Sequence, residues 1–113
     1  MSESFFEGLR ARAATVAESA AAELDHAGDE NSARAALAVL ARDGLLDFTV
    51  AAAHGGAEVP GQDPGRASVR ALCTLRDELA YHHGLLDLML VMQGLGSYPL
   101  QLCLLYTSDA ADE

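Results

Sequence analysis

The fold is decided by residues 74–102, which read TLRDELAYHHGLLDLMLVMQGLGSYPLQL. The stretch begins as an amphipathic helix, is interrupted at His82-His83-Gly84, and resumes as an almost wholly apolar helix over residues 85–102. This second helix has few polar positions, so we expect it to be buried on most of its sides. The segments upstream are expected to cover it.

Length and composition predict one helical domain. The chain has 113 residues, which limits it to a single domain, and 50% of them are hydrophobic, so it can bury a modest core. Alanine, leucine, glutamate and arginine are plentiful, while β-branched residues are few outside Thr49 and Val50, and this balance favours helix. We therefore predict an all-α fold, a bundle of about four helices with a long loop rich in glycine and proline.

Two helices are expected before the decisive stretch. Residues 4–24 carry apolar side chains at spacings of three and four, and Gly28 is the expected stop. A second helix is expected over residues 33–43, capped by Asp29, Asn31 or Ser32 and ended by Gly44. The stripe of the first helix consists of Phe5, Leu9, Ala13, Val16, Ala20 and Leu24.

A loop separates these helices from the rest. Residues 47–50 are predicted to be a short extended piece, and residues 51–66 a loop in which Gly55 and Gly56 permit positive φ and close backbone approach. Ser68 is the expected N-cap of a third helix that reaches about residue 83. Its buried side is predicted to contain Val69, Leu72, Cys73, Leu75, Leu79 and Ala80. In the fourth helix, glycines 94 and 96 are typical of close approach by another backbone or a ligand, and proline 99 predicts a bend or a new segment.

Charge and motifs exclude several functions. The formal net charge of −10, with no lysine and scattered arginines, argues against a nucleic-acid partner. Polar residues and a proline interrupt the apolar helix, so no membrane span is expected, and the absence of a secretory signal favours a cytoplasmic location. Glu78 and His82 are four residues apart, yet spacing fixes no third metal ligand, and no nucleophile motif is present. We expect neither a metal site nor a catalytic residue here.

Asp87 is the one carboxylate near the start of the apolar helix. Two interpretations remain open. It either faces solvent in the first helical turn, where the helix dipole favours negative charge, or it sits in a cavity.

The final segment, residues 103–113, reads CLLYTSDAADE and is similar to one reading frame of a transposon-based sequencing adapter. We therefore interpret residues 1–102 as an incomplete helical domain and residues 103–113 as a non-native tail.

Three motifs, in order, support a family resemblance. Residues 44–56 (GLLDFTVAAAHGG) resemble a turn that ends in a glycine pair, residues 75–81 (LRDELAY) resemble a helix with a Glu-Leu-Ala core, and residues 94–100 (GLGSYPL) resemble a segment ending in L-G-x-x-P-I. Together, residues 40–102 resemble the N-terminal helical domain of the acyl-CoA dehydrogenases. The chain departs from that pattern at Ala51, where the family usually has proline, in the insert at residues 60–65, and at Asp87.

The resemblance implies an FAD-dependent oxidoreductase that performs α,β-dehydrogenation of an acyl-CoA thioester. It also implies a middle β-domain, a C-terminal helical domain that holds the catalytic base, and a homo-oligomer when the enzyme is complete. This fragment would then be inactive alone and would contribute a wall of the acyl pocket. The expected substrate-binding residues, which share one face of the fourth helix, are Asp87, Leu88, Val91 and Leu95.

Other functions remain open. A flavin enzyme of another type, such as an oxidase, would differ only in residues outside this chain. A small helical protein-interaction module without catalysis would be stable and monodisperse, whereas the dehydrogenase interpretation predicts an exposed apolar face on the fourth helix and poor solubility. At the pocket rim, Asp87 would either contact a polar acyl group or contact water.

Overall fold

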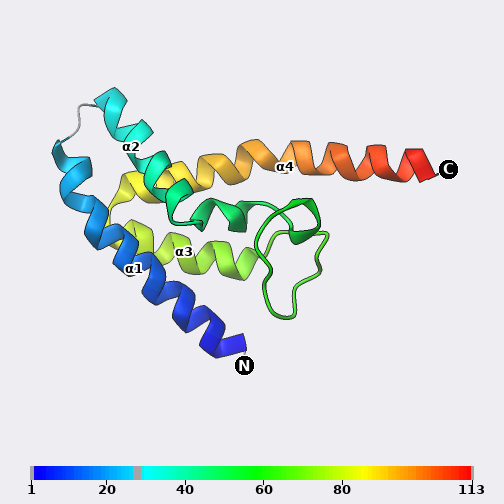
Figure 1. The fold of residues 1–113 in the computed structure, drawn as a ribbon, viewed down its shortest axis with the longest axis horizontal. Helices are drawn as coiled ribbons and strands as arrows, with labels where there is room; N and C mark the ends of the chain where they lie inside the picture. Colours follow the sequence, from blue (N-terminus) through cyan, green and yellow to red (C-terminus); the bar gives the residue numbers. More distant parts are fainter. Residues whose placement is uncertain (1, 27–28, 113) are drawn as a thin grey trace.

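The computed structural model describes residues 2–26 and 29–112, with side chains over residues 3–21, 24 and 31–103 (Figure 1). Within these residues all regular structure is helical, which confirms the predicted all-α class. The predicted stop at Gly28 lies outside the described residues. The elements in order are α1 (Ser2–His26), α2 (Asp29–Arg42), η1 (Leu45–Thr49), η2 (Ala52–His54), α3 (Val69–His82) and α4 (Gly84–Asp112), of which η1 and η2 are short 3-10 helices.

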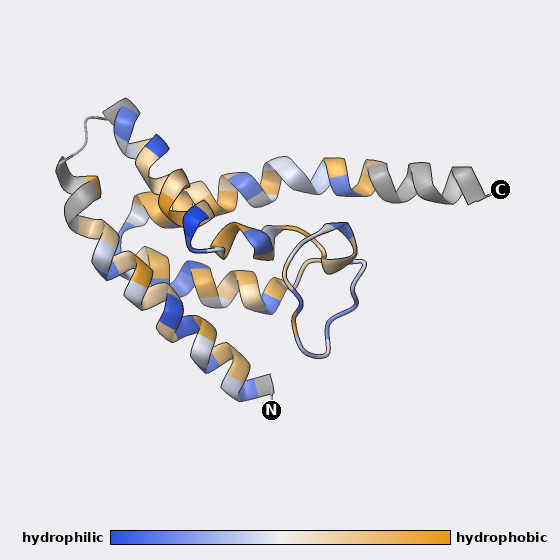
Figure 2. Cartoon of the chain, in the orientation of Figure 1, coloured by the Kyte–Doolittle hydropathy of each residue, from blue (hydrophilic) through white to orange (hydrophobic). Residues whose placement is uncertain are grey.

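The core lies where α1, α2, α3 and the start of α4 meet, and apolar positions gather there (Figure 2). The predicted stripe of α1 is confirmed from Leu9 to Leu24, whereas at its N-terminal end Phe6 is buried and Phe5 only packs against the core. In α2 the buried residues are Ala36, Val39 and Leu40. Because the four α-helices and η1 all contribute to one continuous cluster, they form a single core.

Gly44 ends α2 as predicted. Its φ of 76° lies in the left-handed region, where glycine has no Cβ penalty. Arg12 of α1 donates from Nη2 to the carbonyl oxygen of Asp43, so a cation lies at the C-terminal end of α2, where the helix dipole favours it. Leu45 then turns inward and is fully buried.

The predicted extended piece at residues 47–50 is wrong, because residues 45–49 form the 3-10 helix η1 and only Val50 is extended (φ −119°, ψ 139°). An extended segment needs a partner strand for its backbone groups. Here the backbone groups bond locally instead, from Asp47 N–H to the Gly44 carbonyl and from Val50 N–H to the Asp47 carbonyl. The Thr49 hydroxyl also donates to the Leu46 carbonyl over 2.7 Å.

The loop over residues 51–66 is confirmed apart from the short helix η2 within it. Gly55 has a φ of 95°, and a Cβ on Gly56 would lie 1.8 Å from the carbonyl oxygen of Val50. The glycine pair therefore supplies both predicted properties, positive φ and close backbone approach. A hydrogen bond of 2.7 Å from Ala53 N–H to the Pro64 carbonyl ties the two sides of the loop together.

The helical hairpin begins and turns where the sequence predicts. The Ser68 side chain accepts a hydrogen bond from Ala71 N–H over 3.1 Å at the start of α3. His83 is extended (φ −159°, ψ 113°) and separates α3 from α4.

The predicted buried side of α3 is only partly correct. Leu75 and Leu79 are fully buried, but Val69, Cys73 and Ala80 are exposed, so Cys73 is not the expected buried thiol. Ala71 and Thr74 occupy the core positions instead. The apolar residues of α3 lie on two adjacent faces, and only one of them meets the core.

The expectation that α4 is buried on most sides is wrong. Leu86 and Leu90 are buried, but the helix runs through Pro99 and extends well past the other helices (Figure 1). The rest of the chain covers only one side of its N-terminal part, which leaves an exposed apolar face. The exposed large residues of α4 are Leu88, Met92, Leu95, Tyr98, Leu100 and Leu102. Among the described residues, no helix is long and apolar enough to cross a membrane.

Candidate functional site

An apolar groove lies between α3 and α4. Its volume is about 240 Å³, and almost all of its lining is hydrophobic. It is lined by Val69, Leu72, Cys73 and Arg76 of α3 and by Leu90, Val91, Gly94 and Leu95 of α4. The exposed second face of α3 and the uncovered side of α4 therefore face each other across one hollow.

A second hollow of about 400 Å³ continues the groove away from the turn between the two helices. Both hollows share Val69 and Leu72 as lining residues, so they adjoin. The remaining lining of the second hollow is Gly65, Arg66, Ala67, Tyr98, Gln101 and Leu102. The two hollows are referred to together as the α3–α4 groove.

An ion pair stands at the end of the α3–α4 groove nearest the turn at His83. Arg76 donates from Nε to Asp87 Oδ1 over 2.8 Å and from Nη2 to Oδ2 over 3.5 Å. The Asp87 side chain is 19% exposed and that of Arg76 is 48% exposed. Two parallel donors fix the orientation of the guanidinium more firmly than one contact would.

The hydrogen bond and charge of Asp87 raise the pKa of Arg76 above its ordinary value. A raised pKa of a basic group adds stability that is present below the unfolded pKa and is lost only as the pH rises through the folded pKa. Because an arginine side chain is strongly basic even before its pKa is raised, this guanidinium stays charged throughout the neutral range.

Of the four residues predicted for the site, two line the groove and a third pairs with a residue of its lining. Val91 and Leu95 line it, and Asp87 forms an ion pair with Arg76, which is itself a lining residue. Leu88 is 51% exposed and does not line the groove. Asp87 lies in the first turn of its helix, but its side chain is only 19% exposed and pairs with the Arg76 guanidinium, so it does not simply face solvent.

Two residues that shape this region do not follow from the sequence patterns above. Arg76 lies within the 75–81 segment, but no pattern there gives it a role, although its position eleven residues before Asp87 places the two residues on the two arms of one helical hairpin. Gln101 reads in the sequence only as an interruption of the apolar helix. Its Nε2 donates to the Thr49 carbonyl and its Oε1 accepts from Ala51 N–H, each over 3.0 Å, so it ties α4 to the turn after η1.

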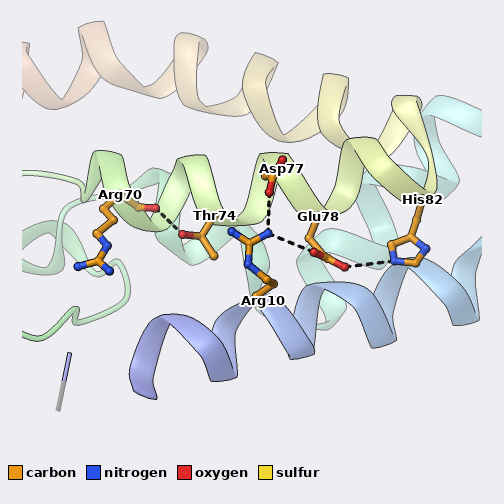
Figure 3. A network of polar contacts seen from close by, with 6 residues as sticks. All are labelled: Arg10, Arg70, Thr74, Asp77, Glu78 and His82. Atoms are coloured by element: carbon orange, nitrogen blue, oxygen red, sulfur yellow. Dashed lines mark hydrogen bonds and ion pairs between the residues drawn. The ribbon is translucent and has the colours of Figure 1, made fainter. Parts of the chain in front are cut away.

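A separate polar network joins α1 to α3 (Figure 3). Arg10 donates from Nη1 to Asp77 over 2.6 Å and to Glu78 over 3.2 Å, and the hydrogen bond to Asp77, followed by that to Glu78, raises the pKa of Arg10. His82 Nε2 lies 3.3 Å from Glu78 Oε1, so the four-residue spacing of this pair places them in contact. No group of three histidine, cysteine or acidic side chains suitable for a metal ion occurs within the described part of the chain.

The groove has the size and chemistry for an alkyl chain. The smaller hollow, of about 240 Å³, falls below the roughly 300–1,000 Å³ of ordinary small-molecule and cofactor pockets. The one charged residue in the lining of this hollow, Arg76, is engaged by Asp87. A flavin does not fit this hollow, and we place none there.

Comparison of the chain with protein-family models found no match, and neither did comparison with characterised proteins or with solved structures.

Proposed function

We propose that this chain supplies one wall of an acyl-chain pocket, as the N-terminal helical domain of an FAD-dependent acyl-CoA dehydrogenase-like oxidoreductase. The observation that carries the proposal is the apolar groove in which Val91 and Leu95, two residues expected from the family resemblance, lie together. Burial of an alkyl chain in such a groove gains about 0.8 kcal/mol for each methylene. The family is proposed from the sequence resemblance, and the groove is an apolar surface whose chemistry suits an acyl chain.

In this proposal the chemistry of the reaction lies outside the chain. A bound FAD would supply the acceptor for the hydride, and a carboxylate of the C-terminal helical domain would supply the base for the α-proton. The residues of this chain bind the acyl tail, orient it along α3 and α4, and exclude water from one side of it. Such positioning is a large contribution to catalysis even though no residue of this chain touches the reacting atoms.

The exposed apolar face of α4 supports the same proposal. Leu88, Met92 and Tyr98 are all more than half exposed, and a row of large apolar residues along one helix is typical of a surface that another domain covers. A middle β-domain and a C-terminal helical domain are the expected cover. The same face also favours the second candidate, a helical module that binds a protein partner and catalyses nothing.

The gene itself separates these two candidates. We would sequence the locus past the codon for Leu102. The proposal predicts that the reading frame continues through a β-rich segment into a second helical bundle that contains a glutamate base. A stop codon directly after Leu102, or genomic codons for CLLYTSDAADE followed by a stop, would contradict the proposal and favour the interaction module.

A further inference from the structure

The solvent-facing side of α4 carries an apolar row with the spacing of a coiled coil. Its members follow one another at intervals of four, three, four and three residues, which is the seven-residue repeat by which two helices pair. The core residues Leu86 and Leu90 lie on the opposite side of the helix, so the row is separate from the face that packs on the fold. We call this row the α4 seam; it consists of Leu88, Met92, Leu95, Pro99 and Leu102.

The α4 seam is large enough for a contact between two copies of the chain. All of its residues are exposed, its four larger side chains by at least half, and Tyr98 beside it is 60% exposed. At roughly 200 Å² of surface for a large side chain, each copy offers on the order of 500–700 Å² of apolar area. Two such faces in contact bury on the order of 1,000–1,400 Å², which reaches the lower end of specific interfaces at about 1,200 Å². This area fits a reversible dimer.

The charge distribution favours a second copy as the occupant. No residue from 88 to 102 is acidic or basic, although the whole chain has a net charge of −10. The nearest charge, that of Asp87, is paired with Arg76 over 2.8 Å. Two seams can therefore meet without opposing like charges, whereas contacts through the acidic parts of the surface are repulsive between identical chains.

We propose that two copies of the chain form a symmetric dimer in which their α4 seams pair antiparallel, with Leu95 at the two-fold axis. The seam is symmetric about Leu95, because Leu88 and Leu102 lie seven residues before and after it. In this register Leu88 of each copy faces Leu102 of the other, and such an isologous contact closes at two copies. A parallel pair would place the two acidic cores side by side, since the other helices cover only the N-terminal part of α4 (Figure 1).

The test is the mass of the full 113-residue chain in solution. Sedimentation equilibrium measures it over about a hundredfold range of protein concentration. A reductant is present, because Cys73 and Cys103 are both exposed and a disulfide between copies must be prevented. We expect a reversible equilibrium between one chain and two, with no larger species.

Met92→Glu is the decisive variant. It places a carboxylate in the middle of the seam, where each copy would bury it without a partner, so we expect dimerisation to weaken at least about a hundredfold. The matched control is Leu100→Glu, which introduces the same charge on the same helix at a residue that is 61% exposed but lies off the seam. We expect this control to dimerise within about twofold of the unmodified chain.

The double variant Leu88→Glu with Leu102→Lys tests the orientation. In the antiparallel register each introduced carboxylate meets an introduced ammonium of the other copy, whereas a parallel pair opposes like charges at both ends. We expect the double variant to dimerise at least about threefold more tightly than Leu88→Glu alone. Equal or weaker dimerisation would overturn the antiparallel register.

The remaining outcomes decide the dimer itself and do not bear on the proposed function. A mass that stays at one chain throughout, or that grows beyond two, would overturn the inference. Dimerisation that survives Met92→Glu would also overturn it, because the contact would then lie on another surface. Circular dichroism checks that each variant keeps its helix content, and Leu88→Glu replaces Met92→Glu if the latter does not.

Discussion

Gln101 Nε2 lies 3.0 Å from the carbonyl oxygen of Thr49, although 52 residues separate the two in sequence. The Oε1 atom of the same amide accepts a hydrogen bond from the N–H of Ala51, so one side chain satisfies two backbone groups of a buried turn. Ser97, one helical turn earlier, adds a hydroxyl donor to the Thr49 carbonyl over 3.3 Å. The C-terminal half of α4 is thereby anchored to the turn that follows η1.

Replacing Gln101 by alanine is expected to lower the free energy of unfolding by about 1–3 kcal/mol, because the Ala51 N–H loses its partner and the Thr49 carbonyl keeps only the Ser97 hydroxyl. Chemical denaturation followed by circular dichroism measures the change. Gln93→Ala, on the same helix, is the matched control, since the structure shows no hydrogen bond from the Gln93 side chain within the described residues, and it should alter stability by less than about 0.5 kcal/mol. Equal losses for both variants would show that the anchor contributes nothing.

Gly56 is expected to tolerate no side chain. A Cβ there would lie 1.8 Å from the Val50 carbonyl oxygen and 2.8 Å from that of Asp47, and both are backbone atoms that cannot move aside without disturbing the turn. We expect Gly56→Ala to cost about 3 kcal/mol of stability. Gly8→Ala is the control, because nothing lies within 4 Å of a Cβ at that position in α1, and it should stabilise the helix by about 1 kcal/mol. A thermal melt of each variant decides, and an unchanged melt for Gly56→Ala would refute the close approach.

Gly94 and Gly96 offer a second matched pair. A Cβ added at either glycine would have no atom within 4 Å beyond the backbone of its own helix, so alanine at either site should stabilise α4 by about 1 kcal/mol. Only Gly94 lines the groove. We therefore expect Gly94→Ala to weaken octanoyl-CoA binding while Gly96→Ala leaves it unchanged, as measured by titration calorimetry. Binding that is unaffected in both variants would place the acyl chain elsewhere.

The local signals in the sequence predicted three of the helix boundaries well, whereas the start of α2 and the end of α4 were predicted wrongly. Gly44, Ser68 and the His83-Gly84 step each act through a backbone property that is encoded in the residue itself, either left-handed φ, a capping hydroxyl or a break in the helix. Such properties need no knowledge of the surrounding fold, so they are readable from the chain alone.

The errors arose where the outcome depends on what surrounds a residue. Thr49 and Val50 favour extended structure, but no partner strand exists within the described residues, and Thr49 bonds locally in η1. Cys73 and Val69 are apolar at helical spacing, yet they face the groove because α1 covers the other side of α3. Periodicity identifies an apolar face but does not say what covers it.

The candidate site was predicted only in part, because its residues also depend on what surrounds them in the fold. Spacing along one helix places Val91 and Leu95 on a shared face, and the resemblance implies that this face lines a pocket, whereas the pairing of Arg76 with Asp87 needs the two helices to fold back on each other at a particular register. A search for opposite charges on the two arms of the expected hairpin would have found this pair.

The most direct test of the account is an NMR titration of the isotope-labelled chain with octanoyl-CoA, in the unmodified form and in the variants Leu95→Asp and Leu88→Asp. Both leucines are exposed residues of α4, but only Leu95 lines the groove. The account predicts that octanoyl-CoA shifts the signals of Val91 and Leu72 far more than CoA does, that Leu95→Asp abolishes these shifts, and that Leu88→Asp retains them. Shifts that are identical with CoA and octanoyl-CoA, or that survive in Leu95→Asp, would contradict it.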